Sequence, residues 1–285
     1  MTIVHDPQCA DYGSSMRPEQ PARVIRAAAR IQDIHPDWAW RLPSPAAGET
    51  ILRVHSPALW QRLGRGPDLD ADTPYFPGIL EHARRAVGAA LESVALARGG
   101  ARTFSLMRPP GHHATRTQAM GFCYLNSIAI AAADAAATGS KVAVWDFDAH
   151  HGNGTEDILR DQAGTFFASV HQYPGYPGTG TTSSGNIANF PVAPHTPREQ
   201  HMAELARSWD AVQAFQPDLV LVSAGFDAYA NDPITEMSLE MDDFAELGRW
   251  LRQAGLPTAA ILEGGYSTDL PLLIDAFLSA WDKEA

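Results

Sequence analysis

Two aspartates and two histidines follow one apolar run of the sequence at close spacing. The run Lys141–Asp146 passes directly into Asp148 and His150. If the extended conformation persists, alternate side chains point the same way, so Asp146, Asp148 and His150 share one face. Carboxylate oxygens and imidazole nitrogens are both normal zinc ligands. The acids could instead cap a following helix, but two carboxylates buried together without a cation would repel each other.

Asp227 is the candidate for a third metal ligand. It comes shortly after the apolar run Leu219–Ser223. A catalytic zinc site usually has three protein ligands and one open position. Alone, this aspartate would fit a turn or a helix cap at least as well. Together with the Asp-x-His pair, it predicts a site for one divalent cation.

Tandem histidines, His112 and His113, follow the run Thr103–Leu106 in a loop that also contains prolines and a glycine. Histidine is the side chain best suited to proton transfer near neutral pH. A lone histidine is more often structural. Two adjacent imidazoles in a restricted loop, in a chain with a predicted metal site, favour catalysis.

A glycine-rich segment follows the last apolar run. Gly264 and Gly265 would allow a ligand to approach the backbone closely, and Tyr266 could donate a hydrogen bond to a developing oxyanion. Taken by itself, the segment fits a simple turn with an ordinary aromatic residue equally well.

The elements that must position these residues alternate along the chain. Short β-branched or aromatic runs predict strands at Thr2–His5, Thr103–Leu106, Lys141–Asp146, Thr165–Val170, Leu219–Ser223 and Thr258–Leu262. Helical patterns cover Pro21–Ile34, Ile79–Arg98, Leu125–Ala137, Arg198–Phe215, Leu239–Ala254 and Leu270–Asp282. This alternation predicts an α/β fold with a parallel sheet between helices, and a site at the carboxyl ends of the strands. No repeat or linker divides the chain, so we expect one domain over residues 1–285.

Composition limits the partners of the chain. Its 285 residues are 45% hydrophobic and 19% charged, with a net charge of −12. Nucleic-acid binders need clustered Lys and Arg, so this acidic chain is not expected to bind nucleic acid. Two cysteines fit a reducing compartment, and neither a signal peptide nor a membrane-spanning run is apparent. We therefore expect a cytoplasmic protein, and the sequence is compatible with a homo-oligomer.

Five motifs together resemble the zinc-dependent histone deacetylase family, which includes bacterial acetylpolyamine amidohydrolases. RPPGHH, GFCYLNSIAIAA, DFDAHHGNGT, SAGFDA and EGGY occur in the family's order. The match is strong from Thr103 to Tyr266 and continues more weakly back to about Arg17. The resemblance implies the arginase-deacetylase fold, with Zn²⁺ at the carboxyl ends of the strands. The RPPGHHA and HHGNGT variants look more like class II and bacterial members.

The resemblance also implies roles for the chemistry-bearing residues. Asp148, His150 and Asp227 match the family's zinc ligands. His113 matches the histidine that takes a proton from water and later protonates the leaving amine, and His112 matches its electrostatic partner.

Three further matches concern residues around that pair. Tyr266 matches the tyrosine that stabilises the oxyanion, and Asp146 matches the acid that orients His112. Asn153 takes the position behind His113, where another branch of the family has aspartate. A neutral amide should raise the pKa of His113 less than a carboxylate would.

Other matches concern substrate and potassium. Gly121, Phe122 and Tyr176 match the walls of an acyl-lysine tunnel, although core packing could also explain them. Asp72 resembles a rim aspartate that binds substrate amides, and Gly265 belongs to the segment next to the substrate. Residues near a structural K⁺ site would be Asp146, Asp148, His150 and Ser169.

Two departures from the family pattern bear on the substrate. Arg17 replaces the histidine that usually precedes Pro-Glu in the first loop, and Ile234 stands where polyamine-selective relatives can carry a glutamate. We expect a zinc amidohydrolase that removes acetyl or a related acyl group from lysine side chains or small alkylamines. Alternatives are an acetylpolyamine amidohydrolase, a non-catalytic module that binds acyl-lysine, and an arginase relative with two manganese ions. Ferrous iron could replace zinc in an Asp/His/Asp site.

Overall fold

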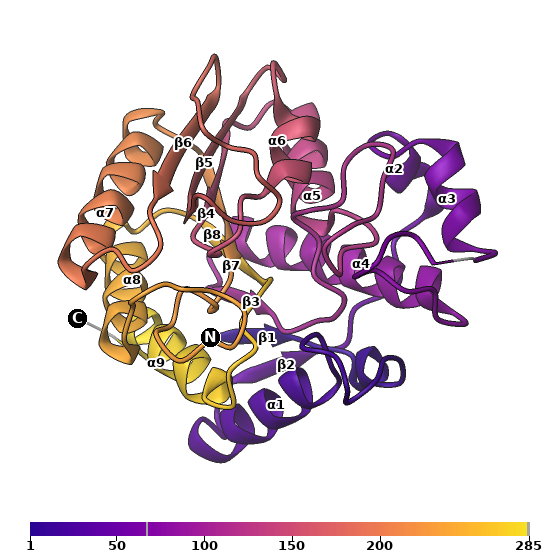
Figure 1. Ribbon diagram of the computed structural model, residues 1–285, viewed down its shortest axis with the longest axis horizontal. Helices are drawn as coiled ribbons and strands as arrows, with labels where there is room; N and C mark the ends of the chain where they lie inside the picture. Colours follow the sequence, from indigo (N-terminus) through magenta and orange to yellow (C-terminus); the bar gives the residue numbers. More distant parts are fainter. Residues whose placement is uncertain (67, 284–285) are drawn as a thin grey trace.

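One parallel sheet forms the centre of the protein (Figure 1). In the computed structural model, which describes residues 1–66 and 68–283, eight strands pair in the order β2-β1-β3-β8-β7-β4-β5-β6. The strands are β1 Thr2–Val4, β2 Ala39–Arg41, β3 Thr103–Ser105, β4 Val142–Asp146, β5 Thr165–Gln172, β6 Ile187–Val192, β7 Leu219–Ala224 and β8 Thr258–Leu262. Every pairing is parallel, so all carboxyl ends lie along one edge of the sheet.

Helices cover both faces of the sheet (Figure 1). They are α1 Ala22–Ile34, α2 Gly48–Leu52, α3 Pro57–Leu63, α4 Ile79–Arg98, α5 Ser127–Ala137, α6 Asn153–Leu159, α7 Arg198–Ala214, α8 Met241–Ala254 and α9 Leu270–Asp282, with a 3₁₀ turn at Pro7–Ala10. Side chains along β4 alternate between two hydrophobic cores. Ala143 and Trp145 join the core shared with α1, α7, α8 and α9, whereas Val142 and Val144 join the core under α4, α5 and α6. This alternation explains why both faces of the strand are apolar in sequence.

The predicted α/β fold is confirmed, with two strands and several short helices missed. All six predicted strands and all six predicted helices are present, with ends that differ by at most two residues. The missed strands, β2 and β6, are the two edges of the sheet. Ala39 and Arg41 of β2 are exposed, and β6 contains Pro191, so neither strand has the continuous apolar run of a buried strand. The missed helices α2, α3 and α6 have five to seven residues, too few to show a helical period.

The strand order brings the chemistry-bearing loops together. β8, β7 and β4 are neighbours, and Asp146 at the end of β4 pairs with Ser223 of β7. The loops after these strands carry the predicted metal ligands and Tyr266, while the histidine loop follows β3, the other neighbour of β8. Among the described residues, no helix is both long and apolar enough to cross a membrane.

Candidate metal and active site

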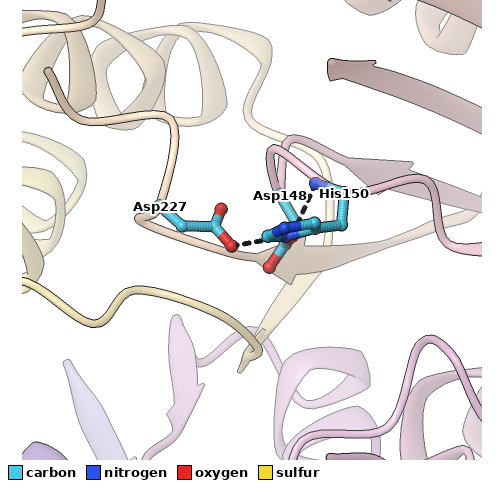
Figure 2. Close-up of side chains that lie close together, drawn as sticks. All are labelled: Asp148, His150 and Asp227. Atoms are coloured by element: carbon cyan, nitrogen blue, oxygen red, sulfur yellow. Dashed lines mark hydrogen bonds and ion pairs between the residues drawn. The ribbon is translucent and has the colours of Figure 1, made fainter. Parts of the chain in front are cut away.

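Asp148, His150 and Asp227 converge after β4 and β7 (Figure 2). One ligand atom from each lies within 4.8 Å of the others. Nδ1 of His150 is 2.8 Å from Oδ2 of Asp227 and 3.2 Å from Oδ1 of Asp148. Both carboxylates are at most 1% exposed. Two buried carboxylates this close repel each other unless a cation or proton lies between them, so the donor set suits a divalent metal ion.

Backbone groups hold the two carboxylates in place. The N–H of Gly264 donates to Oδ2 of Asp148 at 2.7 Å, and the N–H of Ala149 donates to Oδ1 of Asp227 at 2.7 Å. Gly264 must lack a side chain here, because a Cβ would lie 2.3 Å from Asp227 Oδ2 and 2.5 Å from Asp148 Oδ2. A Cβ on Gly225 would lie 2.0 Å from Asp148 Oδ2. The residues therefore fit a metal ion held by atoms whose positions the surrounding backbone restricts.

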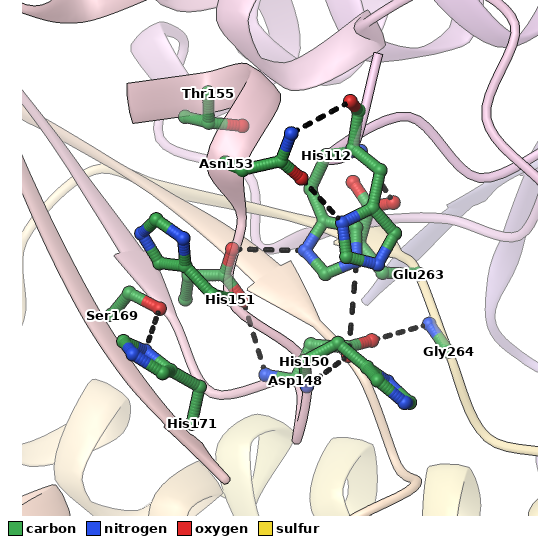
Figure 3. A network of polar contacts seen from close by, with 12 residues as sticks. His112, Asp148, His150, His151, Asn153, Thr155, Ser169, His171, Glu263 and Gly264 are labelled. Atoms are coloured by element: carbon green, nitrogen blue, oxygen red, sulfur yellow. Dashed lines mark hydrogen bonds and ion pairs between the residues drawn. The ribbon is translucent and has the colours of Figure 1, made fainter. Parts of the chain in front are cut away.

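The tandem histidines lie beside this triad, and a polar side chain binds each ring on the side away from it. Figure 3 shows His112 near Asp148 and His150. Nδ1 of His112 is 3.1 Å from Oδ2 of Asp146, and Nδ1 of His113 is 2.8 Å from Oδ1 of Asn153. The opposite nitrogen of His112, Nε2, is 3.7 Å from Asp148. Because each Nδ1–H can donate to an oxygen, each ring has its Nε2 available on the other side. The two rings are 4.1 Å apart between centroids, and that of His113 is 5.9 Å from that of His150.

The two histidines have opposite pKa shifts. Burial lowers the pKa of His113 well below its usual value, and the neighbouring His112 and His150 lower it further. Burial also acts to lower the pKa of His112, but the carboxylates of Asp148 and Asp146 outweigh it and raise that pKa to about 10. A bound divalent cation would oppose protonation of both rings. His113 is therefore the ring best able to remain neutral and accept a proton.

Glu263 fixes the histidine loop, and sequence reasoning gave it no role. Its Oε2 accepts hydrogen bonds from the N–H groups of Gly111 at 2.6 Å and His112 at 3.1 Å. Burial raises the pKa of Glu263 to about 7, although the charge of His112 acts against this. Glu263 immediately follows β8 and belongs to the same EGGY segment as Tyr266. Its place in that segment was the one feature of the sequence that pointed to a role in the site.

A cavity of about 310 Å³ opens above the metal triad. Loops from distant parts of the chain line it with Arg17, Pro18, Asp72, His113, Gly121, Phe122, His150, Tyr176, Ile234 and Tyr266. The aromatic walls contact the reactive side chains: the ring of Tyr176 meets that of His113 edge-on at 5.1 Å, and Phe122 meets Tyr266 at 5.7 Å. Gly121 has φ +56, and a Cβ there would lie 2.6 Å from His113 and 3.0 Å from Tyr176. This glycine therefore lets the wall approach the histidine closely.

Tyr266 is held by contacts that the motifs did not reveal. Asp232 is buried, and its Oδ2 accepts from the N–H groups of Tyr266 at 2.7 Å and Ser267 at 3.2 Å. Oδ1 of the same carboxylate accepts from the N–H of Ile234 at 3.1 Å. The guanidinium of Arg23 lies 4.7 Å from the centre of the Tyr266 ring. Burial raises the pKa of Tyr266 well above its usual value, so its hydroxyl stays protonated and can donate.

Two predicted site residues, Gly265 and Ser169, neither line the cavity nor belong to the metal triad or the histidine pairs described above. Gly265 is buried, and its carbonyl accepts a hydrogen bond from Nε of Arg23 at 2.7 Å. A Cβ on Gly265 would meet Leu270 and Phe226, so this glycine packs against the hydrophobic core. Ser169 pairs with Asp146 across β4 and β5, and its hydroxyl contacts Nδ1 of His171 at 2.9 Å.

Fold and site together define an α/β protein with a candidate metal-binding triad at the carboxyl edge of a parallel sheet, and comparisons with known proteins show its family. The model of the histone deacetylase domain matches residues 16–279. A probable deacetylase of Methanothermobacter thermautotrophicus is 36% identical over 94% of this chain and 86% of its own length. A histone deacetylase-like amidohydrolase of Pseudomonas aeruginosa is 35% identical over 93% of this chain and 75% of its own length.

A solved structure extends the likeness to three dimensions. The acetylpolyamine aminohydrolase of Burkholderia pseudomallei superposes with a TM-score of 0.85 and 25% identity, over 99% of this chain and 98% of that one. The chain belongs to the histone deacetylase family. It is therefore a hydrolase that acts on amide bonds, and the predicted family is confirmed.

Proposed function

We propose that the protein is a zinc-dependent deacetylase that releases acetate from an acetylated lysine side chain or a small acetylated amine. The observation that carries this proposal is that the Asp148–His150–Asp227 triad and the tandem histidines lie together, and that His113 and His150 line one cavity with Tyr266. Asp148, His150 and Asp227 would hold the zinc ion. When bound, zinc supplies a Lewis acid that polarises the acetyl carbonyl and makes the attacking water more acidic.

His113 is the proposed general base. Its Nδ1–H donates to Asn153, which leaves the lone pair of Nε2 free on the other side of the ring. Because burial keeps the pKa of His113 low, the ring is neutral near pH 7 and can take a proton from water at Nε2. It can return the same proton to the nitrogen of the leaving amine as the C–N bond breaks.

His112 and Tyr266 are proposed to stabilise the charge that develops during this step. The Nδ1–H of His112 donates to Asp146, and this contact fixes the ring so that its Nε2 faces the site. Tyr266 lines the same cavity and keeps its hydroxyl proton, so it can donate a hydrogen bond to the carbonyl oxygen as that oxygen becomes negative.

The shape of the cavity supports a slim alkylamine substrate. Phe122 and Tyr176 give it apolar walls that suit a chain of methylene groups, while the more exposed Asp72 and Ile234 complete its lining. The names of two relatives, an amidohydrolase and an acetylpolyamine aminohydrolase, support an acetylated amine as substrate. We also propose that the protein acts in the cytoplasm.

A structural K⁺ ion beside the metal triad is a further part of the proposal. Asp146 pairs with Ser169 on one neighbouring strand and with Ser223 on the other. Within the described residues, the buried hydroxyl of Ser223 has no hydrogen-bond partner. An oxygen in need of a partner next to a buried carboxylate supports a hard monovalent cation near Asp146, Asp148 and His150.

The test is hydrolysis of two substrates by the zinc-loaded protein, an acetyl-lysine peptide and an acetylated polyamine. We expect acetate release from at least one, and a loss of about 100-fold or more in the Tyr266→Phe variant, because the oxyanion loses a donor. Turnover of neither substrate would support the non-catalytic alternative. Metal analysis separates the arginase alternative, because a two-manganese enzyme would bind two ions per chain and the proposed enzyme binds one catalytic ion.

A further inference from the structure

Two opposite charges line the exposed part of the cavity, which we call the mouth and define by Arg17, Asp72 and Ile234. Arg17 is half-buried, Asp72 is exposed and Ile234 is 36% exposed, whereas His113 and His150 lie at the deeper end. Among the residues that line the cavity, Arg17 is the one guanidinium and Asp72 the one carboxylate within the described chain. A ligand that extends from the site to the mouth therefore meets one positive and one negative group.

The backbone of Arg17 is held firmly. Its N–H donates to the carbonyl of Ser14 at 3.3 Å, and a proline follows it. Two residues later, the buried carboxylate of Glu19 binds the guanidinium of Arg108 through Nε and through Nη2, the latter at 2.7 Å. A buried two-point ion pair fixes this loop, so Arg17 is presented to the cavity from a restrained position.

Asp72 is also held in place. Its own N–H donates to Oδ1 of Asp70 at 2.9 Å, which closes a tight turn. The next residue, Thr73, is fully buried, and its hydroxyl accepts from the N–H of Phe122 at 3.0 Å. The backbone at Asp72 is therefore held against the cavity wall through its immediate neighbour, with the side chain of Asp72 exposed.

The guanidinium of Arg17 lacks a partner within the protein. Across residues 1–66 and 68–283, no carboxylate lies within ion-pair distance of it and no hydrogen bond joins it, although the chain carries a net charge of −12. Arginine is the side chain whose planar donors best match a carboxylate, which it binds through two parallel hydrogen bonds. A partly desolvated arginine without a partner, facing a cavity, is therefore suited to bind an anionic group of a ligand.

We propose that the mouth recognises the α-amino-acid head of Nε-acetyl-lysine, with Arg17 binding a free α-carboxylate and Asp72 binding the α-ammonium. This inference rests on the proposed deacetylase function and names its substrate class: free Nε-acetyl-lysine, or a chain that ends in it. Water adds to the acetyl carbonyl, the C–N bond breaks, the amine nitrogen takes the proton from His113, and acetate and lysine leave.

The same charges favour the amino acid over acetylated polyamines. Such a substrate carries only ammonium groups beyond its acetylated end, so Asp72 can bind one of them while Arg17 repels it and stays without a partner. Ile234, which completes the mouth, adds no second negative charge. An internal acetyl-lysine of a peptide lacks the carboxylate, so it leaves Arg17 without a partner.

The experiment compares two substrates that differ in one group. Nε-acetyl-lysine and N-acetylcadaverine have the same acetyl group, methylene chain and terminal amine, and only the first has a carboxylate. We expect the zinc-loaded wild-type protein to hydrolyse Nε-acetyl-lysine with a kcat/KM about tenfold higher or more, since one charge-assisted pair is added. The gain should lie mainly in KM, because the carboxylate is far from the bond that breaks.

Variants of Arg17 assign the preference to this residue. Arg17→Met should abolish the preference, and Arg17→Glu should reverse it in favour of N-acetylcadaverine. Arg207→Met is the matched control: it removes one positive charge from an exposed site on α7 that is outside the cavity lining, and it should keep the wild-type ratio. Thermal unfolding of each variant checks that the fold is intact.

The outcomes separate this inference from the proposed function. Equal hydrolysis of both substrates, a preference for N-acetylcadaverine, or an unchanged ratio in Arg17→Met would overturn the role of Arg17 while leaving the deacetylase function in place. If the wild-type protein hydrolyses neither substrate nor the acetyl-lysine peptide, the proposed function fails and this inference fails with it.

Discussion

Replacing Gly264 by alanine should weaken metal binding without unfolding the protein. The added Cβ would lie 2.3 Å from Oδ2 of Asp227 and 2.5 Å from Oδ2 of Asp148, two of the three proposed metal ligands. Real Cβ contacts below 3.0 Å essentially do not occur, so the carboxylates or the loop must move by about half an ångström or more. The φ angle of Gly264 is outside the left-handed region, so alanine adds no backbone strain.

The expected size of the effect follows from this displacement. Metal–ligand distances in working sites vary by only about 0.2 Å, so the shift exceeds the tolerance of the site. If the loop moves instead, the hydrogen bond from Gly264 N–H to Asp148 lengthens. Changes around metal ligands of this kind typically lower metal affinity by about 10- to 100-fold, or about 1.4–2.7 kcal/mol. Global stability should fall by no more than about 1–3 kcal/mol from the steric clash.

The assay is competition for zinc between the protein and a chromogenic chelator, with circular dichroism to verify the fold. Gly64→Ala is the control, because its added Cβ meets nothing closer than 3.6 Å, at the end of α3. We expect the control to bind zinc as the wild type does. A folded Gly264→Ala protein whose zinc affinity is within about twofold of the control would refute the packing argument.

Three further changes test other parts of the structure. In Asn153→Asp, a carboxylate replaces the amide that contacts His113, so the pKa of that ring should rise. In a plot of kcat/KM against pH, the acidic limb should then shift to higher pH by about one to three units. A limb that does not shift would exclude His113 as the base. Although burial acts to raise the pKa of Asp275, hydrogen bonds from His35, Ser279 and Arg30 outweigh it and lower that pKa. The stabilisation is therefore fully present above the unfolded pKa of about 3.9 and is lost as pH falls through the lower pKa of the folded state, so Asp275→Asn should cost about 1–3 kcal/mol in urea unfolding at pH 7 and progressively less as the pH falls below about 3.9. Glu19→Gln leaves the buried Arg108 without its counter-charge and should lower the free energy of unfolding in urea by about 3–5 kcal/mol. A decrease below about 1 kcal/mol would show that the ion pair contributes little to stability.

The central part of the fold could be predicted from sequence, because burial on both faces leaves a strong pattern. β4 and β7 are buried at every position, so their sequences are continuously apolar. The edge strands lack this pattern: β6 alternates between buried and partly buried residues and contains a proline. Their place in the sheet depends on pairing with β1 and β5, and a single sequence does not reveal such pairing.

The candidate site likewise has a part that could be predicted from the sequence and a part that could not. Residues that carry chemistry through their side chains, such as the Asp-x-His pair and the tandem histidines, are visible as motifs. Contacts made through the backbone leave little pattern in the amino-acid sequence. The sequence does not show that Glu263 accepts hydrogen bonds from the N–H groups of the histidine loop, or that Asp232 accepts one from the N–H of Tyr266. These acids are 151 and 34 residues from their partners, so only the three-dimensional arrangement reveals them.

The single carboxylate of Asp232 joins Ile234 at the mouth to Tyr266 beside the metal triad. We therefore expect the backbone positions of the entrance and of the tyrosine to depend on each other. A substitution at Ile234 that is made to admit a bulkier amine, and that shifts the backbone, is therefore expected to alter the hydrogen bond from Tyr266 N–H to Asp232. Selection for a reshaped entrance is expected to yield compensating substitutions near Asp232, which itself does not line the cavity.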